Sequence, residues 1–338
     1  MNLGSPDSTR VKDLKRYLSE FLMDKRVIDY PYIFRKILVD GIIVPSRAAK
    51  SAEAYQSIWT NDGSPLIVWT KKLEHALENE LDEPVEIGMR YGQPSMESAF
   101  NTLSRIAPKL QEVLAIPLYP HYAMSSYETA VEHAKAIHKK GDYRFTLEFF
   151  RPFYDNGEYI NAMARHIEPF LKMQYDHLLF SFHGIPERHL KRSDPTGKHC
   201  LQSGDCCSRP SVAHETCYRH QCFQTMNLVA DQLQIPKEKF SYSFQSRLGR
   251  EQWLTPYTDF RFVEMPGEGI KRLLVICPAF VSDCLETLEE IEMRGKESFI
   301  SAGGEFFEMI PCLNDSQLWV STLSGWINNY FAGKRDMV

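Results

Sequence analysis

Short apolar runs alternate with amphipathic segments along this chain. Apolar runs that predict strands occupy 65–69, 85–89, 113–118 and 143–149 in the first half, and 177–182, 240–244, 273–277 and 306–310 in the second. Apolar residues recur at helical spacing between them, which predicts helices at 96–106, 126–138, 159–173 and 315–331. Strands that alternate with helices are typical of an α/β fold with parallel sheets.

The two sets of four strands predict two similar α/β halves. We place an N-terminal half at 1–158 and a C-terminal half at 159–314. A helix within 315–338 is expected to pack back on the body. In folds of this class, functional residues gather in the loops at the carboxyl ends of the strands.

Composition narrows the possible functions. The chain has 338 residues, a net charge of −5 and 43% hydrophobic residues, as an ordinary globular protein does. The acidic balance disfavours nonspecific nucleic-acid binding. The longest apolar run, at 273–281, is interrupted by Pro278 and is far shorter than the ~18 residues of a spanning helix. Because we see no signal peptide, we expect a cytoplasmic protein in a reducing compartment.

Cysteines are unevenly distributed. Five of the eight lie close together, at Cys200, Cys206, Cys207, Cys217 and Cys222. A reducing compartment disfavours a disulfide framework, so a metal or iron–sulfur site is the better interpretation.

His183 follows a buried apolar run and precedes a loop shaped by Gly184 and Pro186. Histidine is the side chain best suited to proton transfer near neutral pH. A histidine hydrogen-bonded at a strand end, with no role in catalysis, explains the same pattern equally well.

Three acidic residues follow the 273–277 run. Asp283, Glu286 and Glu290 fall on one face of a helix, where like charges repel unless a cation binds or a proton is shared. The alternative is that Asp283 caps the helix and Glu286 completes a capping box. Spacing alone favours the capping interpretation.

Two further loops could bind a ligand. Arg90 and Tyr91 follow the 85–89 run, and an Arg–Tyr pair at a strand end can hold a carboxylate. The polar segment 245–254 carries Trp253, whose ring can pack on a flat molecule. Loop packing and surface solvation explain both segments as well.

Taken in order, these motifs closely resemble bacterial ferrochelatase, from residue 1 to about 330. The most specific are Ser-Phe-His-Gly-Ile-Pro at 181–186, Phe-Gln-Ser-Arg at 244–247 and Ser-Asp-Cys-Leu-Glu-Thr-Leu-Glu-Glu at 282–290; the others lie at 2–6, 63–65, 89–92 and 118–120. The resemblance implies two Rossmann-like domains, each a four-stranded parallel sheet flanked by helices, with a porphyrin cleft between them. It also implies a lyase of heme biosynthesis that inserts ferrous iron, a substrate, into protoporphyrin IX and releases two protons.

The resemblance assigns roles to individual residues. His183 takes the position of a proton acceptor or metal ligand, and Glu286 that of the catalytic glutamate facing it. Asp283 and Glu290 match acidic positions on the same helix, which would meet the metal. The remaining matches are substrate-binding: Arg90, Tyr91 and Ser64 near the propionates or cleft wall, and Tyr119, Trp253 and Phe280 lining the pocket. How His183 and Glu286 divide their roles stays open.

The cysteine-rich insertion at about 198–222 is similar to that of family members which hold a [2Fe–2S] cluster. We expect Cys200, Cys207, Cys217 and Cys222 to be the ligands, with Cys206 the spare or alternative. A structural zinc site and free thiols are the alternatives. The chain start also differs from the family pattern. Family members usually have several apolar residues before Asn-Leu-Gly, so we expect the first strand to be clipped or short.

Several alternatives to the leading interpretation stay open. The chain could be a chelatase for another tetrapyrrole such as coproporphyrin, a porphyrin carrier without turnover, or an interaction module stabilised by metal at the cysteine segment. The segment 42–45 near Trp59 could form an apolar lip that contacts the inner membrane peripherally, or it could pack into the cleft. The sequence does not indicate an oligomeric state.

Overall fold

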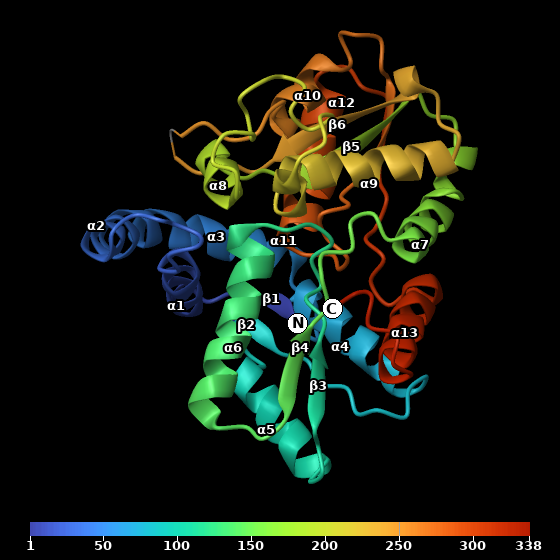
Figure 1. The fold of residues 1–338 in the computed structure, drawn as a ribbon. Coiled ribbons are helices and arrows are strands. Elements are labelled where there is room, and N and C mark those ends of the chain that lie inside the picture. Colours follow the sequence, from blue (N-terminus) through green and yellow to red (C-terminus); the bar gives the residue numbers. More distant parts are fainter. Residues whose placement is uncertain (250) are drawn as a thin grey trace. The chain divides into compact units, whose positions relative to one another are not determined.

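The computed structural model describes residues 1–249 and 251–338, and the chain divides into two compact units (Figure 1). The first unit comprises Met1–Leu118, Met124–Pro152 and Asp315–Val338. The second comprises Tyr119–Ala123 and Phe153–Asn314. Each contains parallel strands flanked by helices, so the predicted α/β class is confirmed.

The second unit contains the four-stranded parallel sheet expected there. Its strands are β5 (His177–His183), β6 (Phe240–Gln245), β7 (Arg272–Ile276) and β8 (Phe306–Met309), in the order β6-β5-β7-β8. They coincide with the four apolar runs to within a residue. Such runs are expected because a parallel sheet is buried on both faces. In the register of β5 with β6, His183 lies opposite Gln245 at the carboxyl edge.

Helices cover this sheet (Figure 1). Phe262 and Phe299 pack with Phe307 of β8 in one buried apolar cluster. The helical segments of the unit are α7 (Gly157–Ile167), η3 (Phe170–Lys172), α8 (Glu187–Ser193), η4 (Val212–Glu215), α9 (Tyr218–Gln232), η5 (Lys237–Lys239), α10 (Thr258–Glu264), α11 (Leu285–Thr287), η6 (Leu288–Gly295) and α12 (Lys296–Ser301). The predicted helix at 159–173 therefore ends earlier, at Ile167, and a separate short turn follows it.

The last three of these segments form one continuous helix that carries Glu286 and Glu290, whereas Asp283, predicted on the same helix face, lies before the first helical residue, Leu285. Its middle section, η6, is a π-helix, a wider form that is frequent at functional sites. The capping pair at its start is Cys284 with Thr287. The capping box considered between Asp283 and Glu286 is therefore wrong by one residue, because Cys284 and not Asp283 takes the N-cap position.

The first unit differs from the predicted four-stranded sheet. β1 (Asn2–Ser5) pairs with β2 (Met89–Gly92), and β3 (Glu112–Ala115) pairs with β4 (Thr146–Phe149), in two separate parallel sheets. The two sheets approach at Met1, which bonds Ile116 and Leu118 through its main chain. β1 is only four residues long, so it does not continue alongside β3.

The apolar run at 65–69 is not a strand, as we predicted, but the start of helix α4 (Pro65–Glu78). Pro65 stands in the first turn, where proline is tolerated, and Leu66, Leu73 and Leu77 are buried at helical spacing. The run is too short for its periodicity to distinguish a strand from the first turns of a buried helix.

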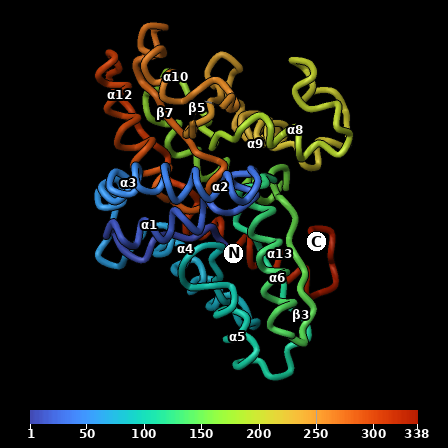
Figure 2. The backbone as a smooth tube through the Cα atoms, turned by 90° about the vertical axis from the view of Figure 1, so that its left-hand side faces the viewer, coloured from blue at the N-terminus to red at the C-terminus, as the bar shows by residue number. Residues whose placement is uncertain are grey.

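The other helices of the first unit are α1 (Val11–Leu22), α2 (Tyr32–Leu38), η1 (Val39–Ile43), α3 (Val44–Ile58), α5 (Met96–Ile106), η2 (Met124–Glu128), α6 (Thr129–Gly141) and α13 (Gln317–Phe331). Helices α1 and α3 lie side by side in both views (Figure 2). Helix α13 packs on α4, and its Trp326 stacks on Phe150 with ring centroids 4.9 Å apart. Among the described residues, no helix is long and apolar enough to cross a membrane.

Candidate active site and cysteine segment

His183 is the last residue of β5, and both its main chain and its ring are held. The ring Nδ1–H donates to the carbonyl of Gly184 at 2.7 Å. The hydroxyl of Tyr218 donates to the His183 carbonyl at 2.8 Å. With the proton on Nδ1, the Nε2 atom of the neutral ring carries the lone pair. His183 can therefore accept a proton or ligate a metal through Nε2.

Glu290 lies close enough to His183 and Glu286 for their charges to affect it. Burial raises the pKa of Glu290, and the neighbouring Glu286 carboxylate raises it further, against the opposing effects of Ser246 and His183. The main-chain N–H and the hydroxyl of Ser246 both donate to the Glu290 carboxylate, at 2.9 and 2.6 Å. Glu290 thus lies within electrostatic range of both His183 and Glu286.

Glu286 is positioned through its main chain. Its carbonyl accepts a 2.8 Å bond from the side-chain amide of Gln245. Its carboxylate accepts a hydrogen bond from the thiol of Cys284, whose pKa is raised well above its ordinary value by burial and by this carboxylate. The start of the acidic helix is therefore tied to the end of β6.

Asp283 has a different environment from the two glutamates. Its carboxylate accepts bonds from the Asn314 amide at 2.7 Å and the Thr287 hydroxyl at 3.0 Å. The main-chain N–H of Cys312 donates to it at 3.3 Å, and the Asn314 side-chain oxygen accepts from the Asp283 N–H at 2.8 Å. Asp283 is fully buried by these contacts, so it anchors the helix start to the loop after β8.

Aromatic residues surround the loop that follows His183. The ring of Phe280 meets that of His183 edge-on, with centroids 6.1 Å apart. Trp253 pairs with Pro186 across an isolated β-bridge, and its indole N–H donates to Leu248. Tyr119 is buried in the same unit. Two of the three predicted pocket aromatics, Phe280 and Trp253, thus lie against the histidine loop.

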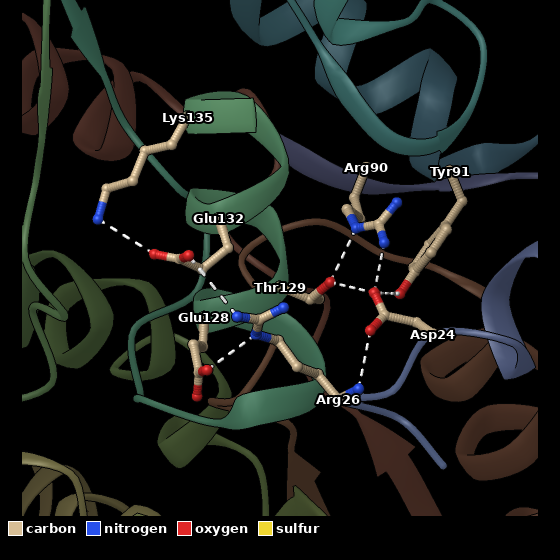
Figure 3. A network of polar contacts seen from close by, with 8 residues as sticks. All are labelled: Asp24, Arg26, Arg90, Tyr91, Glu128, Thr129, Glu132 and Lys135. Atoms are coloured by element: carbon tan, nitrogen blue, oxygen red, sulfur yellow. Dashed lines mark hydrogen bonds and ion pairs between the residues drawn. The ribbon is translucent and has the colours of Figure 1, made fainter. Parts of the chain in front are cut away.

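Arg90 and Tyr91 lie in the first unit, where a buried carboxylate holds them (Figure 3). Asp24 accepts a bond from Tyr91 at 3.0 Å, and it also bonds Arg90 and Thr129. Burial alone would raise the pKa of Asp24, but the bonds from Thr129, Arg26 and Arg90 outweigh it and lower that pKa. The polar atoms expected to meet a propionate are therefore engaged with Asp24.

Ser64 also lies in the first unit and is buried. Its hydroxyl accepts a 2.6 Å bond from the Ser5 hydroxyl, which joins the start of α4 to the end of β1. The Ser64 hydroxyl is therefore engaged with another residue of the first unit.

The clustered cysteines do not all have the same neighbours. The thiols of Cys200 and Cys207 bond the sulfur of Cys217 and lower its pKa, while their own pKa values are raised. Cys206 lies near Cys200 and Cys207. Cys222 lies near Cys217, and its sulfur contacts Tyr218. All five are buried.

Polar side chains fix the main chain of the cysteine segment. Asp194 accepts from the N–H groups of His199 and Cys200, at 2.7 and 2.9 Å. His199 and His214 both bond the carbonyl of Cys206, at 2.8 and 3.1 Å. His220 likewise bonds the carbonyl of Cys207 at 2.7 Å, and its ring stacks on His214. These bonds shape the turn from which the thiols project.

No preformed metal centre appears in the part of the chain that the structure describes. Within 1–249 and 251–338, no group of three or more His, Cys, Asp or Glu side chains is arranged to hold a metal ion. Neighbouring carboxylates on the acidic helix, and neighbouring thiols within the cysteine segment, are close to one another, but neither set has the arrangement of a metal site.

Comparison with known proteins decides the family. A family model described as Ferrochelatase matches residues 1–330. The chain belongs to the ferrochelatase family. Curated ferrochelatases from Pseudomonas savastanoi pv. phaseolicola and Pseudomonas entomophila are 48% and 49% identical over 325 and 331 residues. The alignments cover 96% and 97% of this chain, and 95% and 97% of those proteins.

A solved structure supports the fold. A structure titled SirB from Bacillus subtilis with Fe3+ matches with a TM-score of 0.53 at 12% identity, over 80% of this chain and 93% of that one. At that identity the likeness concerns the fold alone. Membership of the ferrochelatase family makes this chain a metal chelatase, a lyase that inserts iron into protoporphyrin for heme synthesis.

Sequence reasoning missed several residues that organise the site. The Gln-Ser pair at 245–246 belongs to a recognisable motif, but the motif does not predict its contacts with Glu286 and Glu290. The sequence does not single out Tyr218 or Asp194. A signal existed for Gln245 alone, since a polar residue that ends a buried strand must find hydrogen-bond partners.

Proposed function

We propose that this chain inserts ferrous iron into protoporphyrin IX at a site formed by His183, Glu286 and Glu290. The observation that carries the proposal is the tautomer of His183. Its Nδ1–H is committed to Gly184, so that Nε2 carries the lone pair, and Glu290 lies within range of the charges of His183 and Glu286. A porphyrin must lose two pyrrole protons and gain a dication, and a base next to an acidic pair suits both needs.

We assign each residue of the site a role that its side-chain chemistry supports. His183 takes a pyrrole proton at Nε2. Glu286 and Glu290 attract the ferrous ion, and Glu290 is also suited to receive a proton because burial raises its pKa. Asp283 is left out of this set, because Asn314 and Thr287 already satisfy its carboxylate.

We propose fewer porphyrin-binding residues than the sequence predicts. Phe280 and Trp253 border the His183 loop and would pack on the macrocycle. The bonds of Arg90 and Tyr91 to Asp24, and of Ser64 to Ser5, favour structural roles over propionate binding for these three residues.

Iron insertion by the purified chain tests the proposed substrate directly. We expect faster insertion into protoporphyrin IX than into coproporphyrin under the same conditions. Equal or faster use of coproporphyrin would reject the choice of porphyrin, and porphyrin binding without insertion would favour a carrier.

For the cysteine segment we propose a [2Fe–2S] cluster held by Cys200, Cys207, Cys217 and Cys222. The donor set suits such a cluster, because the thiols are buried and those of Cys200 and Cys207 both bond the sulfur of Cys217. Once bound, a cluster supplies metal–thiolate bonds that cross-link the segment. Cys206 is the alternative to Cys222, because it lies near two of the other three thiols.

Metal analysis and a visible spectrum of protein purified without oxygen test the cluster. About two irons per chain with charge-transfer absorption are expected for a [2Fe–2S] centre. Colourless protein that contains zinc would support the alternative site, and metal-free protein with full activity would reject both.

A peripheral membrane contact is also proposed, because one helix of the first unit presents unusually apolar side chains to solvent. In α2, Ile33 and Phe34 are 70% and 68% exposed, and Tyr32 and Ile37 are similar. Isolated exposed apolar residues are common, but a cluster on one helix indicates an interaction surface. Lys36 on the same helix is paired with Asp40 at 2.8 Å, so the proposed contact depends on the apolar side chains.

Flotation with vesicles tests this contact. Phe34→Asp is expected to reduce binding to anionic vesicles, whereas Val212→Asp, which changes an apolar residue 62% exposed in the second unit, is expected to leave it unchanged. Equal binding of the two variants would reject the contact.

A further inference from the structure

Gln245 ends β6, an edge strand of the second unit's sheet that pairs with β5, and its side chain is fully buried. Its main chain lies opposite His183 in the register of β5 with β6. Its carbonyl accepts a 2.6 Å bond from the N–H of Gly184, the residue whose own carbonyl holds the His183 ring. The backbone of Gln245 is thus part of the support of the proposed base.

The side chain of Gln245 connects three other elements. Its oxygen accepts from the hydroxyl of Ser181 on β5 at 2.9 Å and from the thiol of Cys277 after β7 at 3.6 Å. Its nitrogen donates to the carbonyl of Glu286 at 2.8 Å. The amide orientation is determined by these partners, because the Glu286 carbonyl can only accept a hydrogen bond.

The next residue supports the second glutamate. Ser246 has a φ of +63°, in the left-handed region that residues other than glycine seldom adopt. In that conformation both its N–H and its hydroxyl reach the Glu290 carboxylate. Strained residues of this kind are found where surrounding contacts maintain them, often at functional sites.

We propose that Gln245 is a positioning residue, which sets the start of the acidic helix, and with it Glu286, against His183. The inference rests on the proposed function, because it assumes that His183 and Glu286 act together. Gln245 itself touches neither iron nor porphyrin. Its contribution is to hold two catalytic elements at one separation through a single buried amide.

Gln245→Glu gives a specific test, because a protonated glutamate reproduces the amide's arrangement of one donor and one acceptor. The ionised form has no donor for the Glu286 carbonyl. Burial raises the pKa of a carboxyl at such a site, so the protonated form persists well above the usual pH range of glutamate. The ratio of the variant's kcat to that of the native chain is expected to rise at least tenfold as pH falls, with little change in the KM for porphyrin.

Comparison with the native chain at each pH removes the titration of the neighbouring groups. Those facing Gln245 and its partners are Cys277, Glu286, Glu290 and His183, and all four are present in both proteins. Gln245→Met, which cannot donate at any pH, is expected to stay tenfold or more below the native kcat throughout. Ser181→Ala is the matched control: it removes one bond to the Gln245 oxygen, leaves the Glu286 bond, and should show no pH-dependent ratio.

The outcomes separate this inference from the proposed function. A ratio for Gln245→Glu that does not change with pH, or a folded Gln245→Met with native kcat, overturns the positioning role. If Gln245→Glu does not fold, the kcat and KM of Gln245→Met decide, and a lower kcat at unchanged KM supports the role. Native turnover by His183→Ala would instead overturn the proposed site, whatever the Gln245 variants do.

Discussion

The hydroxyl of Tyr218 donates a 2.8 Å hydrogen bond to the main-chain carbonyl of His183. Tyr218 directly follows Cys217, and it also contacts the sulfur of Cys222. The cysteine segment and the proposed base are therefore joined by one fully buried side chain. A displacement of Tyr218 caused by a change at Cys222 would therefore alter a hydrogen bond to His183.

Tyr218→Phe keeps the ring and removes only this bond. We expect kcat for iron insertion to fall about fivefold, the rate equivalent of roughly 1 kcal/mol for a lost hydrogen bond, with an unchanged KM for porphyrin. Steady-state kinetics measure the effect. Tyr242→Phe on β6 is the control and should leave kcat unchanged; if both variants behave alike, Tyr218 does not act through His183.

Asp283→Asn tests the separation of Asp283 from the glutamates. The substitution replaces one of the two acceptor oxygens with an NH2 donor, which must then face either the Asn314 amide or the Thr287 hydroxyl and the Cys312 N–H. We therefore expect a loss of about 2 kcal/mol in the free energy of unfolding. Urea denaturation measures it. Glu289→Gln, which removes the charge from a two-bond pair with the half-exposed Arg294, should cost less, about 0.5 kcal/mol. Native stability with a raised KM for iron would return Asp283 to the metal set.

A pair of cysteine substitutions tests the proposed ligands. Cys217→Ser removes the sulfur to which Cys200 and Cys207 both bond, and we expect it to lose the bound iron. Cys206→Ser should retain iron, because Cys206 is the proposed spare. Iron content per chain and the visible spectrum measure the outcome. Iron loss in Cys206→Ser but not in Cys222→Ser would exchange those two assignments.

Because the pKa of Glu74 is raised, we expect the free energy of unfolding to depend on pH. Burial raises its pKa from 4.5 to about 7, even though the N–H of Ile87 donates to it at 2.8 Å. A carboxyl with a higher pKa in the folded state loses stability as pH rises from 4.5 through 7. Glu74→Gln keeps an acceptor without the charge, so it should be more stable than the native chain at pH ~8 and not at pH ~4.5.

The size of that effect is limited by the partial exposure of Glu74. After allowance for solvent screening, a gain of about 1 kcal/mol corresponds to a Tm increase of roughly 2–4 °C. Thermal melts at the two pH values measure it. An equal difference in Tm at both would show that the Glu74 charge does not matter to stability.

The sequence predicts features that depend on neighbouring residues better than features that depend on residues far apart in the chain. The strands of the second unit could be located because a parallel strand buried on both faces is rich in apolar residues, as β5 is between its two terminal histidines. The run beginning at Pro65 could not be assigned, because a few apolar residues fit a strand and a helix alike.

The site shows the same limit. Motifs identify His183 and Glu286, but helical spacing predicts Asp283 on the same helix face as Glu290, whereas in the structure Asp283 precedes the helix and has other neighbours. The difference comes from Asn314, which lies 31 residues further along the chain. Likewise, Arg90 could be recognised as a carboxylate-binding residue, but its partner is Asp24 in this chain and lies 66 residues away.

The central claim is that His183 is the base for iron insertion, and His183→Ala tests it most directly. Porphyrin binding is followed by fluorescence quenching and iron insertion by the absorbance of heme, on the same sample. The account predicts that the variant binds protoporphyrin with an affinity near that of the native chain and loses at least a hundredfold in insertion rate, within the range for removal of a general base. Insertion at the native rate would contradict it.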